Sequence, residues 1–290
     1  MKLLADLKSI TNISKYQADG LIFSDSEFSC AVESLFAFEE IEEIVRYCQK
    51  NKLISVLNID RIIAEDELSF LFSKLEKFLE LGIDYYIFGD FSILSYFRKR
   101  GEEGRLIYNP KTLITNSADA YLYKEMGIKV AISNELNFND ILAISKVGNG
   151  IFEIYGHHQI FYSKRPLLSS FSKHYNLNKN LDNTLLHLQE EKREALYPVY
   201  ESKHGTFIYT SYRYALFLEL PYLKDELLFG RINPTFIEEE EVIEIISLYK
   251  KALASTETEV KSLYEELIKI NANIERGFLE KKSVLLKEEE

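Results

Sequence analysis

Short apolar runs alternate with helix-forming segments between residues 20 and 156. Six runs have the length and composition of buried strands: GLIFS (20–24), LISVLNI (53–59), DYYIFGD (84–90), RLIY (105–108), IKVAIS (128–133) and GIFEIYG (150–156). Because single helical segments separate them, we expect parallel pairing through right-handed crossovers. Neither GxGxxG nor GxxxxGKS/T occurs, which disfavours a nucleotide-binding doubly wound sheet. The prediction is an α/β fold, a TIM-like (β/α) barrel of irregular form.

The pattern changes after Ser170. A polar stretch predicts an insertion near residues 171–196 that includes a charged helical segment at 189–195, and the runs YPVYES and TFIYTS predict a small β excursion on the barrel. From Phe236 a helical pattern predicts a C-terminal extension (236–290) packed on a barrel domain (1–235). The extension would cover the barrel's own flank or serve as a docking surface. Its end, KKSVLLKEEE, reads as a solvated tail or a last edge strand.

Charge and cysteine content narrow the classes of function. A net charge of -11 and a pI of about 5.2 repel phosphate backbones, so nucleic-acid contact would need a local basic patch. Cys30 and Cys48 lie far apart, without a CxxC or histidine-rich neighbourhood, so neither a disulfide framework nor a metal site is predicted. The amino terminus does not resemble a signal peptide, and no run approaches the roughly 20 apolar residues of a membrane span. We therefore expect a cytoplasmic protein with no membrane partner.

In a (β/α) barrel, chemistry occurs at the carboxyl ends of the strands. Asn58 and Asn109 lie at two such ends, where they could bind a ligand or satisfy loop backbone. Glu135 lies beyond a third and could act as a general acid or base, or cap the following turn. His157 and His158 follow a fourth. Adjacent residues leaving a strand point to opposite sides and no further ligand pattern accompanies them, so we favour satisfied polar residues of a rim loop over acid/base or metal chemistry.

Basic residues form two clusters. Ser163, Lys164 and Arg165 end the stretch EIYGHHQIFYSKR, and the two cations could contact RNA phosphates or form a structural ion pair. Arg98 to Arg100 are interpreted as helix C-terminal charges. For proteolysis a nucleophile with its base or a metal is needed, and no GxSxG or zincin pattern occurs.

An ordered set of segments resembles the collagenase-like peptidases, family thirty-two of the peptidases of unknown mechanism. The set covers nearly the whole chain: YQADGLIFS, VLNID, DYYIFGDFSIL, NPKTLITNSADAYLYKEMGIKVAISNELNFNDI, EIYGHHQIFYSKRPLLSSF, YPVYESKHGTFIYT, ELLFGR, YKKAL and RGFLEKK. The resemblance implies a (β/α) barrel with added elements. It also implies a pocket where Asn58, Asn109, Glu135, Tyr155 and Arg231 converge.

The chain departs from the family pattern where chemistry is expected. Members usually carry a His-Gly pair and two cysteines where this sequence has Tyr155, Gly156, Gln159 and Pro166. The later cysteines that complete an iron-sulfur cluster in many relatives have no counterpart here. Such a cluster needs four thiolates, so we expect this chain to carry no cluster and no other cofactor.

Some bacteria carry two paralogues of this family, and the present sequence resembles the clusterless one in SKRPLLSSF and RGFLEKK. The resemblance implies a role in hydroxylating carbon five of the wobble uridine in certain transfer RNAs, with prephenate-derived chemistry. A cluster-bearing paralogue and transfer RNA would be the partners. The older family label implies a peptidase or other hydrolase, and a third interpretation is a non-catalytic scaffold on a retired enzyme fold.

Overall fold

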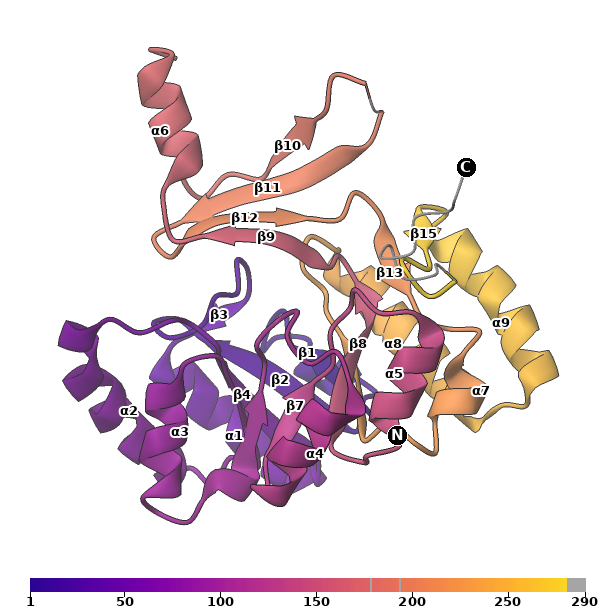
Figure 1. Cartoon of the computed structure of the whole chain (residues 1–290). Coiled ribbons are helices and arrows are strands. Elements are labelled where there is room, and N and C mark those ends of the chain that lie inside the picture. Colours follow the sequence, from indigo (N-terminus) through magenta and orange to yellow (C-terminus); the bar gives the residue numbers. More distant parts are fainter. Residues whose placement is uncertain (178, 193, 281–290) are drawn as a thin grey trace.

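Eight parallel strands close into a barrel in the computed structural model, which describes residues 1–177, 179–192 and 194–280 (Figure 1). The ring runs β14-β1-β2-β4-β5-β6-β7-β8 and is closed by pairing of β8 with β14. Its strands are β1 (Lys2–Asp6), β2 (Gly20–Asp25), β4 (Ile54–Ile59), β5 (Tyr85–Phe88), β6 (Leu106–Tyr108), β7 (Lys129–Ala131), β8 (Gly150–Gly156) and β14 (Phe229–Ile232). The predicted TIM-like α/β barrel is confirmed.

The six predicted strands are all present, and β1 and β14 are the two that the apolar pattern did not predict. In each of them a charged residue limits the apolar run: Asp6 is the last residue of β1, and Arg231 lies inside the four-residue β14. Both charged side chains face the interior at the barrel mouth, so the feature that hid these strands in the sequence belongs to the pocket described below.

Helices surround the barrel and bury their apolar faces on it (Figure 1). They are α1 (Phe38–Asn51), α2 (Leu68–Glu80), α3 (Phe91–Arg98), α4 (Ser117–Glu125), α5 (Phe138–Ser145), α7 (Leu220–Leu223), α8 (Glu239–Ala254) and α9 (Glu257–Ile270). Three begin at Asp90, Asn116 and Asn137, whose side chains accept backbone N–H groups of the first turn. Only the short 3₁₀ helix Ile13–Lys15 lies between β1 and β2, which makes the barrel irregular.

A four-stranded antiparallel sheet stands above the barrel mouth (Figure 1). We call it the excursion; it comprises β9 (Gln159–Ser163), α6 (Leu167–His174), β10 (Leu186–Gln189), β11 (Leu196–Ser202) and β12 (Gly205–Tyr209). One face packs Tyr162, Phe207 and Tyr209 against loop residues of the barrel. The predicted helix at 189–195 is wrong for the described residues there, because hairpin pairing with β11 continues through Gln189. The helix of this region is α6 instead, too short to show a clear period.

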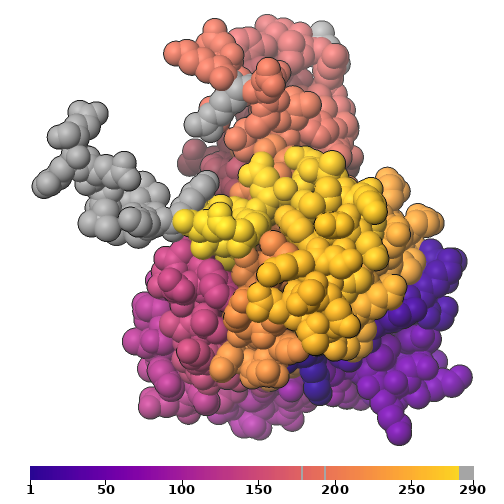
Figure 2. All heavy atoms as spheres, turned by 90° about the vertical axis from the view of Figure 1, so that its right-hand side faces the viewer, coloured from indigo at the N-terminus to yellow at the C-terminus, as the bar shows by residue number. Residues whose placement is uncertain are grey.

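The C-terminal helices are part of the barrel wall. Helix α8 directly follows the eighth strand, and its buried Tyr249 donates a hydrogen bond to the Ile154 carbonyl of β8 (3.0 Å). Glu239 in its first turn accepts from Asn12 (2.6 Å) and Ser9, which ties it to the loop after β1. Figure 2 shows the C-terminal helices covering this side of the barrel, with the excursion above. The helices after residue 236 therefore pack directly on the barrel.

Short strands complete the architecture. They are β3 (Leu35–Phe36), β13 (Arg213–Ala215) and β15 (Ile274–Glu275). Strand β3 pairs with β2, β13 pairs with β8, and β15 pairs with β13. The expectation of a tail or edge strand in KKSVLLKEEE falls on residues 281–290, outside the described part. None of the helices the structure describes combines the length and the apolar character needed to cross a lipid bilayer.

Truncation of Ile246, which is fully buried on α8, tests whether this helix belongs to the barrel. Ile246→Ala is expected to lower the free energy of unfolding by about 3 kcal/mol, because it leaves a cavity in the shared core. Exposed Lys251→Ala on the same helix should change it by less than about 0.5 kcal/mol. Urea denaturation measures both, and an unchanged global midpoint for Ile246→Ala would show that α8 is a separable appendage.

Candidate functional site

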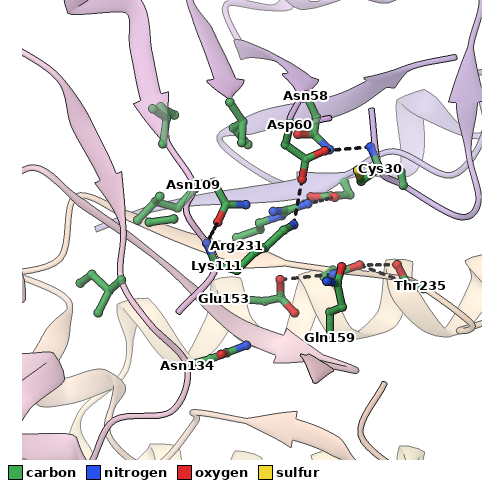
Figure 3. Close-up of a pocket in the computed structure, with 18 of the residues that line it drawn as sticks. Cys30, Asn58, Asp60, Asn109, Lys111, Asn134, Glu153, Gln159, Arg231 and Thr235 are labelled. Carbon is green, nitrogen blue, oxygen red and sulfur yellow. Dashed lines mark hydrogen bonds and ion pairs between the residues drawn. The ribbon is translucent and has the colours of Figure 1, made fainter. Parts of the chain in front are cut away.

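A pocket opens at the carboxyl ends of the barrel strands, and Figure 3 shows the side chains that line it. Its volume of about 100 Å³ is several times the roughly 10–15 Å³ that one water needs, so it can hold a small organic molecule. The polar residues of its wall are Asp6, Asn58, Asp60, Asn109, Lys111, Asn134, Glu153, Gln159, Arg231, Asn233 and Thr235. They come from segments as far apart in the sequence as residues 6 and 235, and closure of the barrel brings them together.

A two-residue repeat along the strands builds the base of this pocket. Side chains on a strand alternate between the two faces, so residues two apart point into the same space. In four strands an apolar residue of the barrel interior is followed two positions later, within the same strand, by a polar residue that lines the pocket: Leu4 and Asp6, Val56 and Asn58, Ile151 and Glu153, and Phe229 and Arg231. We call Asp6, Asn58, Glu153 and Arg231 the polar ring. It lies directly above an apolar floor.

Arg231 lies between two carboxylates of the polar ring. Its Nε donates to Asp6 Oδ1 (2.8 Å) and a second guanidinium nitrogen donates to Asp6 Oδ2, a two-point ion pair. Glu153 is the register partner of Arg231 on β8. Burial raises the pKa of Asp6 and of Glu153, and the guanidinium only partly offsets the effect.

Glu153 has the properties of a proton-transfer group. Its Oε2 accepts from Asn233 Nδ2 (3.2 Å), while the buried Oε1 has no hydrogen-bond partner among the described residues. A carboxyl group with a raised pKa and an oxygen that has no hydrogen-bond partner, here Oε1 with His158 Nε2 at 3.8 Å, can exchange a proton with a ligand in the pocket. Glu153 is therefore the strongest acid/base candidate of the site.

A second ion pair lies at the pocket mouth (Figure 3). Lys111 Nζ donates to Asp60 Oδ2 (2.8 Å), and the backbone N–H of Cys30 donates to Asp60 Oδ1 (2.9 Å). Burial would raise the pKa of Asp60, but Lys111 and these hydrogen bonds hold it below its ordinary value. The pKa values of Asp60 and Glu153 are therefore shifted in opposite directions within one pocket.

Asn58 presents an unused acceptor. Its side-chain nitrogen donates to Ser24 Oγ (3.2 Å) and Ser29 Oγ (3.0 Å), which fixes the amide orientation. Its Oδ1 is buried without a partner among the described residues. Together with Glu153 Oε1 it offers acceptors for N–H or O–H groups of a ligand, while Lys111 and Arg231 offer positive charge for an anionic or carbonyl group.

The two cysteines do not fit an iron-sulfur cluster. Cys30 lines the pocket, whereas Cys48 is buried among the apolar residues of α1. Burial and the Asp60 carboxylate raise the pKa of Cys30 to about 12, so its thiol remains protonated and is no activated nucleophile. Two separated thiols fall short of the four that a cluster requires, and no chemical step is derived through one.

The pocket brings together some of the sequence-predicted residues. Asn58 and Asn109, which the strand ends indicated, and Arg231, which the family resemblance indicated, line it. Glu135 does not; it is exposed beyond β7, and the preceding Asn134 takes the place in the wall. Tyr155 points outward, with its ring 5.8 Å from that of Tyr249.

The histidines lie beside the pocket, and neither lines it. His157 Nδ1 is 2.8 Å from the Thr210 carbonyl oxygen. His158 packs on Tyr214, with ring centroids 4.2 Å apart, and its Nε2 lies 3.3 Å from the Glu153 carbonyl oxygen. Burial lowers the pKa of His158 to about 4, so the ring is neutral at pH 7. These contacts are those of structural rim residues.

Ser163, Lys164 and Arg165 lie at the far end of β9, outside the pocket. Ser163 Oγ accepts the Arg165 backbone N–H (3.2 Å) and shapes the turn. Both cations are exposed, and neither forms an ion pair within the described ranges of the chain. A structural ion pair, the alternative to phosphate contact, is thus not seen there.

Sequence reasoning missed Asp6, Lys111 and Glu153 as candidates. The signal that identifies Asp6 and Glu153 is the polar residue placed two positions after an apolar one inside a strand. Lys111 follows the strand-end Asn109 by two residues and has a left-handed backbone, with φ of 65°, a conformation that costs energy for a non-glycine residue.

Opposite pKa shifts predict opposite effects of neutralising two pocket carboxyl groups. Glu153→Gln is expected to raise the free energy of unfolding at pH of about 7.5, because the raised folded-state pKa makes ionisation destabilising above the ordinary value of 4.5. Asp60→Asn should lower it there, because its lowered folded-state pKa stabilises the ionised form. The Glu153→Gln difference should disappear as the pH falls below about 4, whereas the Asp60→Asn difference should persist there and vanish only as the pH falls through the lowered folded-state pKa of Asp60. Chemical denaturation at the two pH values measures them, and effects of the same sign at pH 7.5 would contradict the assignment.

Comparison with known proteins gives one curated relative along almost the whole chain. It is the protein named tRNA hydroxylation protein P2 of Bacillus subtilis (strain 168), 22% identical over 285 residues, which covers 92% of this chain and 92% of the relative. Two solved structures are more distant. The U32 peptidase Mk0906 is 12% identical over 55% of this chain and 70% of its own, with a TM-score of 0.45. The N-(5'-phosphoribosyl)anthranilate isomerase from Pyrococcus furiosus is 10% identical over 87% and 98%, with a TM-score of 0.43.

The family model described as Peptidase family U32 matches residues 5–286. The match begins one residue before Asp6, so it includes all four positions of the polar ring and extends over the excursion and the C-terminal helices. The chain belongs to peptidase family U32.

Proposed function

We propose that this chain is a clusterless subunit of a system that hydroxylates carbon five of the wobble uridine in transfer RNA. The observation that carries the proposal is the similarity, over 92% of both chains, to a protein named for transfer-RNA hydroxylation. The two buried cysteines support a subunit without its own cluster, which would act beside a cluster-bearing paralogue in the cytoplasm.

The polar ring suits a small acidic substrate such as prephenate. Lys111 and the guanidinium nitrogen of Arg231 that takes no part in the pair with Asp6 would bind carboxylate oxygens of the substrate. Asn58 and Glu153 would accept from a hydroxyl group through oxygens that have no partner among the described residues. Glu153 would then hold or release the proton that the reaction moves, and the redox group would lie in the paralogue.

Nothing in the site favours proteolysis, the activity that the family name suggests. Cys30 is protonated because its pKa is raised to about 12. In the described part of the chain, no histidine ring is hydrogen-bonded to a serine, threonine or cysteine side chain. A non-catalytic scaffold is also disfavoured, because a carboxyl group whose pKa is raised in the folded state lowers stability at neutral pH, which a scaffold without a working site has no need to retain.

Deletion of the gene in its host tests the proposal. Mass spectrometry of transfer-RNA nucleosides should show loss or reduction of 5-hydroxyuridine derivatives, and reintroduction of the intact gene should restore them. Growth with and without oxygen controls for a redundant pathway. An unchanged nucleoside profile under both conditions would refute the proposed function.

A further inference from the structure

We propose that the outer end of the excursion binds the loop of an RNA, so that a base turned out of that loop can reach the pocket. This inference rests on the proposed function and assigns to it a surface that the family match and the pocket leave unexplained. We call this surface the basic tip; its residues are Lys164, Arg165, Phe171, Lys173, Tyr175 and Lys179.

The charge of the basic tip is exceptional in this chain. No aspartate or glutamate occurs between Glu153 and Asp182, the longest acid-free stretch in a sequence whose net charge is -11. All four cations of the tip are exposed, and none forms an ion pair within the parts of the chain that the structure describes. A local cluster of unpaired cations on an acidic protein is what binding of a polyanion requires.

Two exposed aromatic rings accompany the cations. Phe171 and Tyr175 lie one helical turn apart at the end of α6, with ring centroids 4.7 Å apart, and are 52% and 60% exposed. Exposed aromatic side chains next to unpaired cations are the combination that binds single-stranded nucleic acid, because bases stack on the rings while cations contact phosphates. A purely apolar protein interface would not need the cations.

A buried carboxylate holds the basic tip in place. Glu201 is 1% exposed and accepts the backbone N–H groups of Leu168 (2.7 Å) and Ser169 (3.1 Å) in the first turn of α6. Thr206 Oγ1 donates to the same carboxylate (3.0 Å). Helix α6 is thus anchored to the sheet at one end, while its other end projects away from the barrel (Figure 1).

Strand β9 connects the basic tip to the pocket. Gln159 at its start lines the pocket, and Ser163 at its end precedes Lys164, so roughly 15 Å of extended chain separates the two sites. Between them lies an open groove lined by Ile62, Leu113 and Phe161, all exposed. Enzymes that modify a base extrude it from its stack, and this groove offers an apolar path for such a base while flanking phosphates stay on the tip.

The inference is tested with an anticodon stem-loop RNA that carries an unmodified wobble uridine. Its binding is measured by fluorescence anisotropy over a series of salt concentrations, both to the full chain alone and to the full chain together with its cluster-bearing paralogue. Replacing Lys164, Arg165, Lys173 and Lys179 by Gln should weaken binding at least about ten-fold at about 0.15 M salt and reduce the salt slope by about 3. Phe171→Ala with Tyr175→Ala should weaken it roughly five-fold or more and leave the slope unchanged.

A matched control removes four cations elsewhere. Lys50, Lys77, Arg98 and Lys99 are exposed at or just beyond the carboxyl ends of α1, α2 and α3, each of which leads to the start of the next barrel strand, away from the pocket. Their replacement by Gln changes the net charge equally and should leave the affinity within about two-fold. Equal effects of the two charge variants would overturn the inference. The inference would also be overturned if the tip variant kept its affinity for RNA but no longer bound the paralogue, since the surface would then be a protein interface.

The outcomes separate this inference from the proposed function. If gene deletion abolishes 5-hydroxyuridine but substitutions in the basic tip leave the RNA affinity unchanged, only the present inference fails. If deletion leaves the nucleosides unchanged, the proposed function fails, whatever the tip binds.

Discussion

Closure of the barrel by β14 is the constraint on which the site depends. This strand pairs with β1 on one side and β8 on the other, and so brings the first and last strands of the barrel ring into contact. Arg231 on β14 then lies between Asp6 and Glu153, from the two neighbouring strands. Without that pairing the three charges would be far apart, and the pocket would lose both its guanidinium and its acid/base candidate.

The same interior sets different protonation states for similar side chains. Glu153 lies above an apolar floor with one oxygen unpaired, and burial raises its pKa. Asp60, at the mouth, has a lysine partner and a backbone donor, which lower its pKa. Pairs of carboxyl groups with opposite shifts are how a single pocket supplies both a fixed charge and a proton carrier. This division of roles argues for a working site at the barrel mouth.

Much of the fold was predictable from local pattern, and the site was predictable only in part. Apolar runs and amphipathic helices identified six of the eight strands, and strand ends identified Asn58 and Asn109. Tyr155 was expected in the pocket because it occupies the position of the histidine that members of the family usually carry there. A register irregularity in β8, where Ile232 pairs with Tyr155 directly after Arg231 pairs with Glu153, breaks the alternation and turns Tyr155 outward. The pairing of residue 6 with residue 231 depends on closure, which no local pattern reveals.

Complementation of the deletion strain tests most directly whether the polar ring is a working site. The strain would express the wild-type chain, Glu153→Gln, or Glu135→Gln, in which an exposed carboxylate outside the pocket is neutralised as a control. Protein levels would be compared by immunoblot and 5-hydroxyuridine by mass spectrometry. A working ring requires that Glu153→Gln accumulate normally yet leave 5-hydroxyuridine low, while Glu135→Gln restores it. Full restoration by Glu153→Gln would show that the ring is not used and that the chain serves its partner as a scaffold.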